Sequence, residues 1–157
     1  MKVGIYCRVS TDEQNIEQQK QFLIEYCRKQ NFSYLSYIDE AISGKVSERP
    51  AWNKLLRDAA KGKVEAILVS KYDRITRDLG YAITFLAWIK KTKVRLISVY
   101  DSGTFSFSPD EIFNFKLKCL LSEYELEQLR WRSQIGIERA KREGKYKGRK
   151  KGSKNKI

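Results

Sequence analysis

Short apolar runs alternate with longer helical patterns along the first hundred residues. Strands are predicted at residues 3–6, 34–38, 66–69 and 95–99. Helices, with apolar residues spaced by three and four, are predicted at about 16–30, 52–62 and 79–92. This alternation predicts a three-layer α/β fold, in which a mostly parallel sheet is covered by helices on both faces.

Polar residues gather where the predicted strands end. Arg8 and Ser10 follow the first strand, Asp39 follows the second, and the segment 71–77 follows the third. The segment 39–50 is rich in Gly, Ser and charge, and we expect it to be a loop. Sheets of this kind bind ligands at the carboxyl ends of their strands. A functional site is therefore expected at that edge.

From Pro109 the pattern changes to one long helix that ends near Arg142. Its apolar stripe has spacings of three, four or seven, at Leu117, Leu121, Tyr124, Trp131 and Ile135. A small domain cannot cover a helix of this length, so its second half should project. We expect three parts: an α/β catalytic domain over 1–108, the helix over 109–142 and a basic flexible tail over 143–157. The alternative is a lone helix folded back on its own domain.

The charge is +13, from 32 basic and 19 acidic residues, and much of it lies at the carboxyl terminus. Residues 139–157 hold ten basic side chains against Glu143 alone. Such a block favours a polyanion-binding arm, and a solubilising tail is the alternative. With the heptad-like stripe, it suggests a dimer helix that continues onto DNA. The candidate DNA-binding residues are Arg130, Arg132, Arg139, Arg142, Lys147, Arg149, Lys150 and Lys151.

Several site types are excluded by composition. The chain has no His, which removes Ser-His-Asp hydrolysis and the usual general base. Its three Cys form no C-x-x-C pair, so neither a disulfide framework nor a zinc site is indicated. No apolar run approaches the length of a membrane span, and we expect a soluble cytoplasmic protein.

Two motifs carry the candidate chemistry. The first, residues 6–11 (YCRVST), contains Ser10, which alone would be interpreted as a helix cap. The second, residues 71–78 (KYDRITRD), contains Arg74 and Arg77, which share one face if a helix begins there. With Arg8 they would form an anion site suited to phosphoryl transfer, and nearby cations would favour the Ser10 alkoxide.

Two roles remain open for Asp73. It could transfer a proton, or it could hold Arg74 or Arg77 in place. A two-metal nuclease would need converging carboxylates, and Asp39, Asp73, Asp78 and Asp101 are present. The cations among them argue against a metal.

Together the two motifs resemble the serine site-specific recombinase family, in its resolvase/invertase catalytic domain, over about residues 1–142. The resemblance implies that Ser10 is the nucleophile that forms a 5′-phosphoserine link with DNA. It also implies a phosphate-binding set of Arg8, Arg49, Lys71, Arg74 and Arg77. The implied polar supports are Tyr6, Gln14, Gln19, Asp39 and Asp73. Neither a metal nor a high-energy cofactor is implied.

The resemblance further implies a homodimer that assembles into a synaptic tetramer on double-stranded DNA, in a prokaryotic cytoplasm. Two departures stand out. The family's Glu-Arg on the long helix is Glu125-Leu126 here, and no helix-turn-helix follows the basic run within these 157 residues. The chain is then either a catalytic fragment or a small recombinase that binds DNA through helix and tail alone.

Two other functions fit parts of the sequence. A non-catalytic DNA-binding or architectural protein could keep the fold and the tail. A nucleotide-binding or phosphatase-like enzyme is weaker, because no Gly-rich phosphate loop follows any strand.

Overall fold

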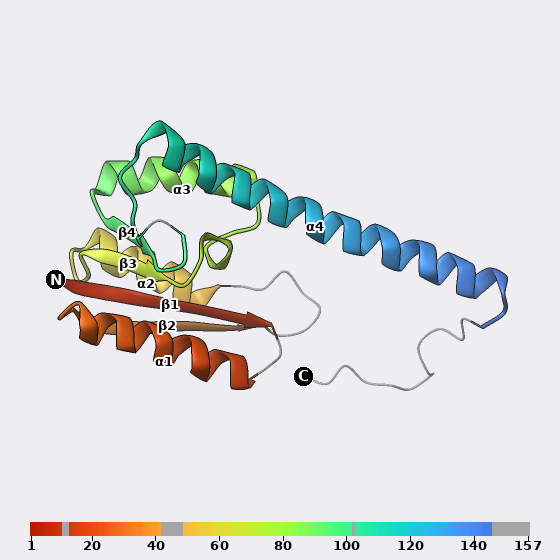
Figure 1. The fold of residues 1–157 in the computed structure, drawn as a ribbon, viewed down its shortest axis with the longest axis horizontal. Coiled ribbons are helices and arrows are strands. Elements are labelled where there is room, and N and C mark those ends of the chain that lie inside the picture. Colours follow the sequence, from red (N-terminus) through yellow and green to blue (C-terminus); the bar gives the residue numbers. More distant parts are fainter. Residues whose placement is uncertain (11–12, 42–48, 102, 146–157) are drawn as a thin grey trace.

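The computed structural model of the protein describes residues 1–10, 13–41, 49–101 and 103–145. The strands are β1 (Lys2–Ser10), β2 (Ser33–Ala41), β3 (Ala66–Val69), β4 (Arg95–Ser98) and β5 (Gly103–Thr104). The helices are α1 (Glu13–Lys29), α2 (Pro50–Ala60), α3 (Leu79–Thr92) and α4 (Pro109–Arg142), with a 3₁₀ turn, η1 (Tyr72–Arg74). The strand order is β2-β1-β3-β4-β5, parallel except for the pair β4–β5. The expected three-layer α/β fold is confirmed (Figure 1).

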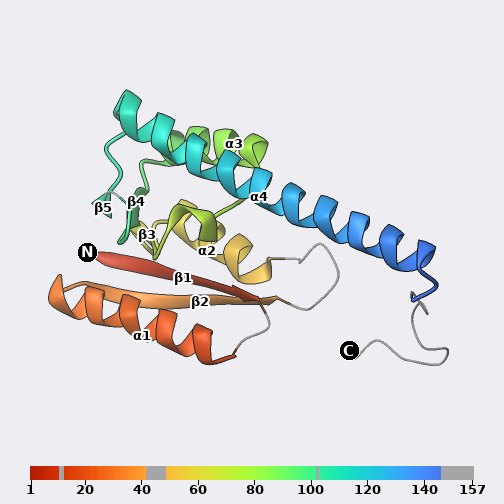
Figure 2. The same cartoon turned by 45° about the vertical axis from the view of Figure 1, so that its right-hand side comes forward.

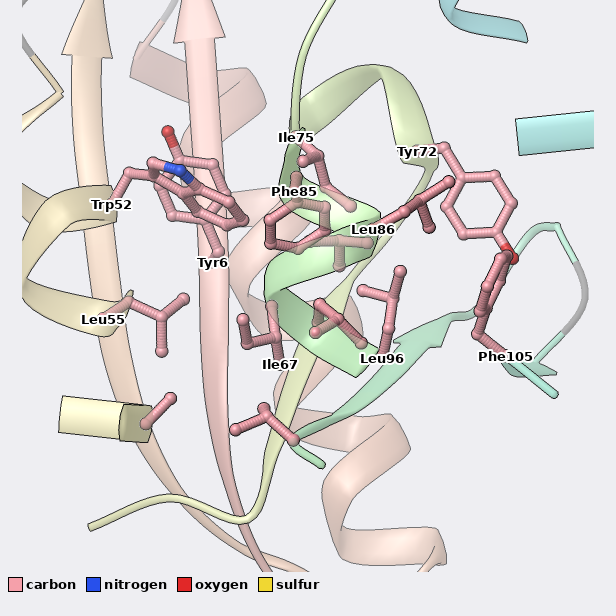
Figure 3. Packing of buried hydrophobic residues seen from close by; sticks show 14 of the residues in the cluster. Tyr6, Trp52, Leu55, Ile67, Tyr72, Ile75, Phe85, Leu86, Leu96 and Phe105 are labelled. Carbon is pink, nitrogen blue, oxygen red and sulfur yellow. The ribbon is translucent and has the colours of Figure 1, made fainter. Parts of the chain in front are cut away.

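Each face of the sheet has its own apolar core, because side chains alternate along a strand. On one face, Val3, Ile5 and Cys7 of β1 pack against Leu23 and Cys27 of α1. The other face is covered by α2 and α3, with α4 packed on α3 (Figure 2). The side chains of this second core include Tyr6, Trp52, Leu55, Ile67, Tyr72, Phe85 and Leu96 (Figure 3).

The first two strands are longer than predicted. β1 and β2 stay paired from Lys2↔Ser33 to Ser10↔Ala41. Arg8, Ser10 and Asp39 therefore lie in the final residues of strands and not after them, because ladder hydrogen bonds continue past the apolar residues. The short β5 was not predicted, since Gly103 and Thr104 give no apolar signal.

Helix α4 extends far beyond the sheet (Figure 1). Phe115 and Cys119, in its first half, are buried against the domain. From Leu129 to Arg139 every described side chain is exposed. A helix folded back on its own domain is thus excluded for the second half of α4. In the described part of the chain, no helix has the length and apolar character needed to cross a membrane.

Candidate active site

The site begins at the carboxyl end of β1. Arg8 is half-buried and pairs in register with Asp39 of β2. Ser10 is the last residue of β1, opposite Ala41. For Ser10, and for Gln14 in α1, the description covers the backbone alone. The backbone therefore places Ser10 at the sheet edge where the sequence predicted the site.

Tyr6 and Arg49 form the inner wall of this edge. The Tyr6 hydroxyl donates to Asp39 Oδ2 at 2.9 Å and accepts from Arg49 Nε at 3.1 Å and Nη2 at 3.0 Å. The Arg49 guanidinium also lies over the rings of Tyr6 and Trp52, with its Cζ 5.2 and 4.8 Å from their centroids. Burial raises the pKa of Tyr6 to about 12 despite the nearby Arg49 charge. The Tyr6 hydroxyl therefore stays neutral and hydrogen-bonded to both Asp39 and Arg49.

Asp39 fixes the start of α2. Its carboxylate accepts from the backbone N–H of Ala51 at 2.9 Å and of Trp52 at 3.0 Å. A carboxylate at a helix amino terminus satisfies unpaired N–H groups and complements the helix dipole. Asp39 is 4% exposed, so the sequence expectation of a loop residue is wrong. Its contacts are those of a polar support, since they tie β2, β1 and α2 together.

Arg49 also reaches the second motif. Its guanidinium donates to the backbone oxygens of Ile75 and, at 3.3 Å, Arg74. In this conformation its Nε and both terminal nitrogens are engaged within the protein. Because the Arg49 guanidinium is also packed against the rings of Tyr6 and Trp52, its contacts suit positioning better than direct phosphate binding.

The second motif does not start a helix, contrary to the conditional prediction. Tyr72–Arg74 is a 3₁₀ turn, and α3 begins only at Leu79, capped by the Asp78 side chain. Asp78 accepts from the backbone N–H of Tyr81, which is why the helix starts there. Arg74 and Arg77 thus do not share a helical face: Arg74 is half-buried and Arg77 is exposed.

Arg74 connects the turn to β1. Its Nη1 donates to the backbone oxygen of Arg8 at 3.2 Å. Its Nε and Nη2 donate to the two carboxylate oxygens of Asp73 at 3.2 and 3.0 Å. Of the two roles left open for Asp73, this bidentate contact favours holding Arg74 in place.

Positive charge is concentrated around Arg8. Burial lowers the pKa of the Arg8 guanidinium, and the charges of Arg49 and Arg77 lower it further. Among the described residues, no carboxylate lies within ion-pair distance of Arg8 or Arg77. An Arg stays protonated under these conditions, so Arg8 and Arg77 carry charges that no ion pair among the described residues balances. A phosphate group would balance them.

The remaining predicted site residues lie at the margin. Lys71 is exposed, with its Nζ 5.7 Å from the Tyr100 ring centroid. Gln19 Oε1 is buried and has no hydrogen-bond partner in the described part of the chain. Burial raises the pKa of the Cys7 thiol to about 11, so this neighbour of Arg8 stays protonated and is no rival nucleophile.

No group of three or more Cys, Asp or Glu side chains in the described ranges is arranged to hold a metal ion. The two site motifs meet around arginine side chains, with Ser10 at the end of β1.

Comparison with known proteins identifies the family. The family model "Resolvase, N terminal domain" matches residues 3–146. A putative DNA recombinase of Bacillus subtilis is 34% identical over 137 residues, which are 85% of this chain and 27% of that protein. The DNA-invertase of Escherichia phage P1 is 32% identical over 149 residues, 95% of this chain and 75% of that protein. The chain belongs to the serine recombinase family.

A solved structure supports the same assignment. A resolvase family site-specific recombinase from Streptococcus pneumoniae matches with a TM-score of 0.64 at 27% identity, covering 90% of this chain and 99% of that one. The sequence resemblance is thereby confirmed. This serine recombinase chain spans about a quarter of the Bacillus subtilis protein and three quarters of the phage invertase.

The candidate DNA-binding residues of this chain fall into two groups. Arg130, Arg132, Arg139 and Arg142 are exposed on the second half of α4. Lys147, Arg149, Lys150 and Lys151 lie outside the described residues. The exposed arginines leave α4 with a basic surface where it extends past the sheet.

Sequence reasoning missed the structural role of one carboxylate at this edge. Asp101 follows β4 and accepts from the Tyr72 backbone N–H at 2.8 Å and from the Ser98 hydroxyl at 2.5 Å. The sequence suggested it only as one carboxylate for a metal. Asp101 also follows a strand, so the expectation that site residues gather at the carboxyl ends of strands applies to it as it does to Arg8 and Asp39. Its ion-pair partner Lys118 could not be recognised from local spacing, because it lies 17 residues away in α4.

Proposed function

We propose that this recombinase domain breaks and rejoins DNA strands through Ser10. The observation that carries the proposal is the gathering of Arg8, Arg74 and Arg77 at the carboxyl end of β1, where the Ser10 backbone lies. In the described part of the chain Arg8 and Arg77 have no ion-pair partner, and Arg74 is paired with Asp73. The transition state of phosphoryl transfer spreads negative charge over oxygens that guanidinium groups can bind.

The reaction follows from these groups. The Ser10 Oγ attacks the phosphorus of a DNA phosphodiester, the bond to the 3′ oxygen breaks, and that oxygen takes up a proton. The product is a 5′-phosphoserine link and a free 3′ hydroxyl. Religation is the same transfer in reverse, with another strand's 3′ hydroxyl as the nucleophile. The proton of Ser10 passes to an acceptor for which Asp73 is a poor candidate, because both its oxygens already accept from Arg74.

We assign the remaining side chains by their contacts. Arg8 and Arg74 bind the phosphate, and the exposed Arg77 and Lys71 approach it when DNA is present. Asp73 orients Arg74, while Tyr6, Asp39 and Arg49 hold β1, α2 and η1 in register. Gln19 adds a buried amide oxygen from α1, and the family resemblance assigns Gln14 a similar supporting role.

DNA is the partner, and the protein acts as a homodimer that pairs into a tetramer. The apolar stripe of α4 supports this assembly, since Leu121, Tyr124 and Trp131 are 50%, 57% and 60% exposed. Exposed apolar side chains in such a row are typical of a surface that another chain covers. The basic end of α4 then lies along the duplex, and the protein works in the prokaryotic cytoplasm, where that DNA is.

The test uses a supercoiled plasmid library with randomised inserts, because the target site of this chain is to be found in the same experiment. Protein and plasmid are mixed and quenched with denaturant, and DNA that carries protein at a 5′ end is recovered and sequenced. We expect recovery with the wild type and none with Ser10→Ala, which should keep its salt-dependent DNA binding. Equal recovery with Ser10→Ala would exclude the proposal.

A further inference from the structure

Asp101 is a buried carboxylate that joins three elements. Its side chain is 6% exposed. Oδ2 accepts from the Tyr72 backbone N–H at 2.8 Å and from the Ser98 hydroxyl of β4 at 2.5 Å. Oδ1 accepts from Lys118 Nζ of α4 in an ion pair. One side chain thus holds η1, the end of β4 and α4 at a common point.

The element that Asp101 holds carries the second motif. Tyr72 is the first residue of η1, directly before Asp73 and Arg74. Arg74 in turn donates to the backbone oxygen of Arg8. The placement of the Tyr72 amide therefore sets where the Arg74 guanidinium lies relative to the end of β1.

Helix α4 also contacts Tyr72 through its ring. The ring packs edge-on against Phe115 of α4, with centroids 4.8 Å apart, and Lys118 Nζ lies 5.7 Å from its centroid. Between η1 and α4 there is nevertheless a hollow of about 330 Å³, whose lining includes Asp73, Asp101, Lys118 and Leu121. The Asp101–Lys118 pair spans this incompletely packed boundary.

The surroundings of the Lys118 side chain change when another chain packs on α4. Its side chain is 47% exposed. Its neighbours on the helix include Leu117 and Leu121, which are 37% and 50% exposed. A chain that packs on this stretch removes water from the ion pair, and an ion pair strengthens as its surroundings become less polar.

We propose that Asp101 is a positioning residue for the Asp73–Arg74 turn. Through its ion pair with Asp101, Lys118 makes the strength of the hydrogen bond between Asp101 and the Tyr72 amide depend on where α4 lies. The proposal rests on the proposed function in one respect, which is that Arg74 binds the reacting phosphate. It adds to that function a physical link between the helix that meets a second copy and the turn that meets DNA.

The first measurement is amide hydrogen exchange by NMR, which needs no DNA. Lys118→Met should speed exchange at Tyr72 about tenfold or more, because the carboxylate that accepts from this amide loses its charge partner. Lys118→Arg should restore slow exchange. Because the Lys118 side chain is half exposed, its replacement leaves the apolar core intact, and Asp101→Asn is a second route to the same broken pair.

The chain offers a matched control on another part of the domain. Lys63 Nζ pairs with the buried Asp58 at 2.9 Å, and Asp58 also accepts from the Tyr37 hydroxyl at 2.9 Å. Lys63→Met breaks an ion pair of the same kind without touching η1. It should leave exchange at Tyr72 unchanged.

The second measurement is the rate of 5′ protein–DNA link formation on plasmids recovered with the wild type. Lys118→Met should lower this rate about tenfold at unchanged DNA affinity, with rescue by Lys118→Arg and no effect of Lys63→Met. Unchanged exchange at Tyr72, unchanged link formation, or an equal loss in both Met variants would each overturn the proposal. If the wild type forms no link at all, the proposed function fails, and the exchange result still decides whether Asp101 holds the turn.

Discussion

At the scale of the residue, Tyr6 is where the internal hydrogen bonds of the site meet. It is 0% exposed, and its hydroxyl contacts both Asp39 and Arg49. Burial raises the pKa of Tyr6 to about 12 from 10.0. Ionisation of this one hydroxyl is therefore coupled to the stability of the fold.

The coupling predicts a pH dependence. The raised pKa stabilises the folded state fully below pH 10, and this contribution is lost as the pH rises toward 12. Two pKa units correspond to about 2.7 kcal/mol. The difference in unfolding free energy between wild type and Tyr6→Phe should shrink by up to that amount across this window, as measured by urea unfolding. A difference that stays constant above pH 10 would contradict the burial of the Tyr6 hydroxyl.

At the scale of the element, β1 packs directly against α2 at Gly4. A Cβ at this position would lie 2.3 Å from Leu55 Cδ1 and 3.3 Å from Tyr37 Cε2. A Cβ at Gly136, in the projecting half of α4, would meet nothing within 4 Å. One glycine is thus required by packing, and the other only weakens its helix.

These two glycines predict opposite effects of the same substitution. Gly4→Ala should destabilise the domain by about 1–3 kcal/mol, because the core must shift to admit the methyl group. Gly136→Ala should stabilise α4 by about 0.5–1 kcal/mol. Urea unfolding and helical circular dichroism report the two changes. A Gly4→Ala variant as stable as the wild type would show that β1 and α2 are not in close contact.

What the sequence could predict also differs by element. The run of four apolar residues in β3 was recognised because both faces of that strand are buried. The carboxyl ends of β1 and β2 were not recognised, because polar residues such as Arg8 and Asp39 lie there. Backbone hydrogen bonds continue the strand pairing through these residues. Both motifs were found from local spacing. The break between η1 and α3 depends on the Asp78 cap, which the motif itself does not distinguish from a helix interior.

The contacts that the sequence could not give are the long-range ones. Arg49 meets Tyr6 across 43 residues, and only the fold brings them together. Asp101 and Lys118 meet because α4 returns over η1 after β5. No local periodicity encodes such a pairing. The sequence could therefore locate the site, but it could not show which side chains hold the catalytic residues in position.

At the scale of the whole molecule, α4 presents two kinds of surface. The side that holds Phe115 and Cys119 packs on the domain. At 3.6 residues per turn, Tyr124 and Trp131 of the apolar stripe face away from it. This arrangement leaves the stripe available to a second copy.

The proposed dimer predicts a change of mass in solution. Trp131→Glu should shift the protein from dimer to monomer in analytical ultracentrifugation, because a charge in a helix seam is not solvated there. Ser133→Glu, on the other side of the projecting helix, should leave the dimer intact. Identical sedimentation of all three proteins would argue against the stripe as the interface.

The basic end of α4 predicts how salt acts on DNA binding. Arg139→Gln and Arg142→Gln should each weaken binding to random-sequence duplex DNA and lower the slope of log affinity against log salt by about 1. Glu138→Gln, on the same stretch of helix, should not lower the slope. Unchanged slopes in both Arg variants would remove α4 from the DNA interface.

The central claim is the covalent chemistry of Ser10, and it has one direct measurement. Protein trapped on plasmid DNA by denaturant is digested with nuclease and protease, and the peptides are sequenced by mass spectrometry. A nucleotide 5′-phosphate attached to Ser10, absent from Ser10→Ala, is the predicted result. Attachment at any other residue, or strand cleavage that leaves no attached nucleotide, would contradict it.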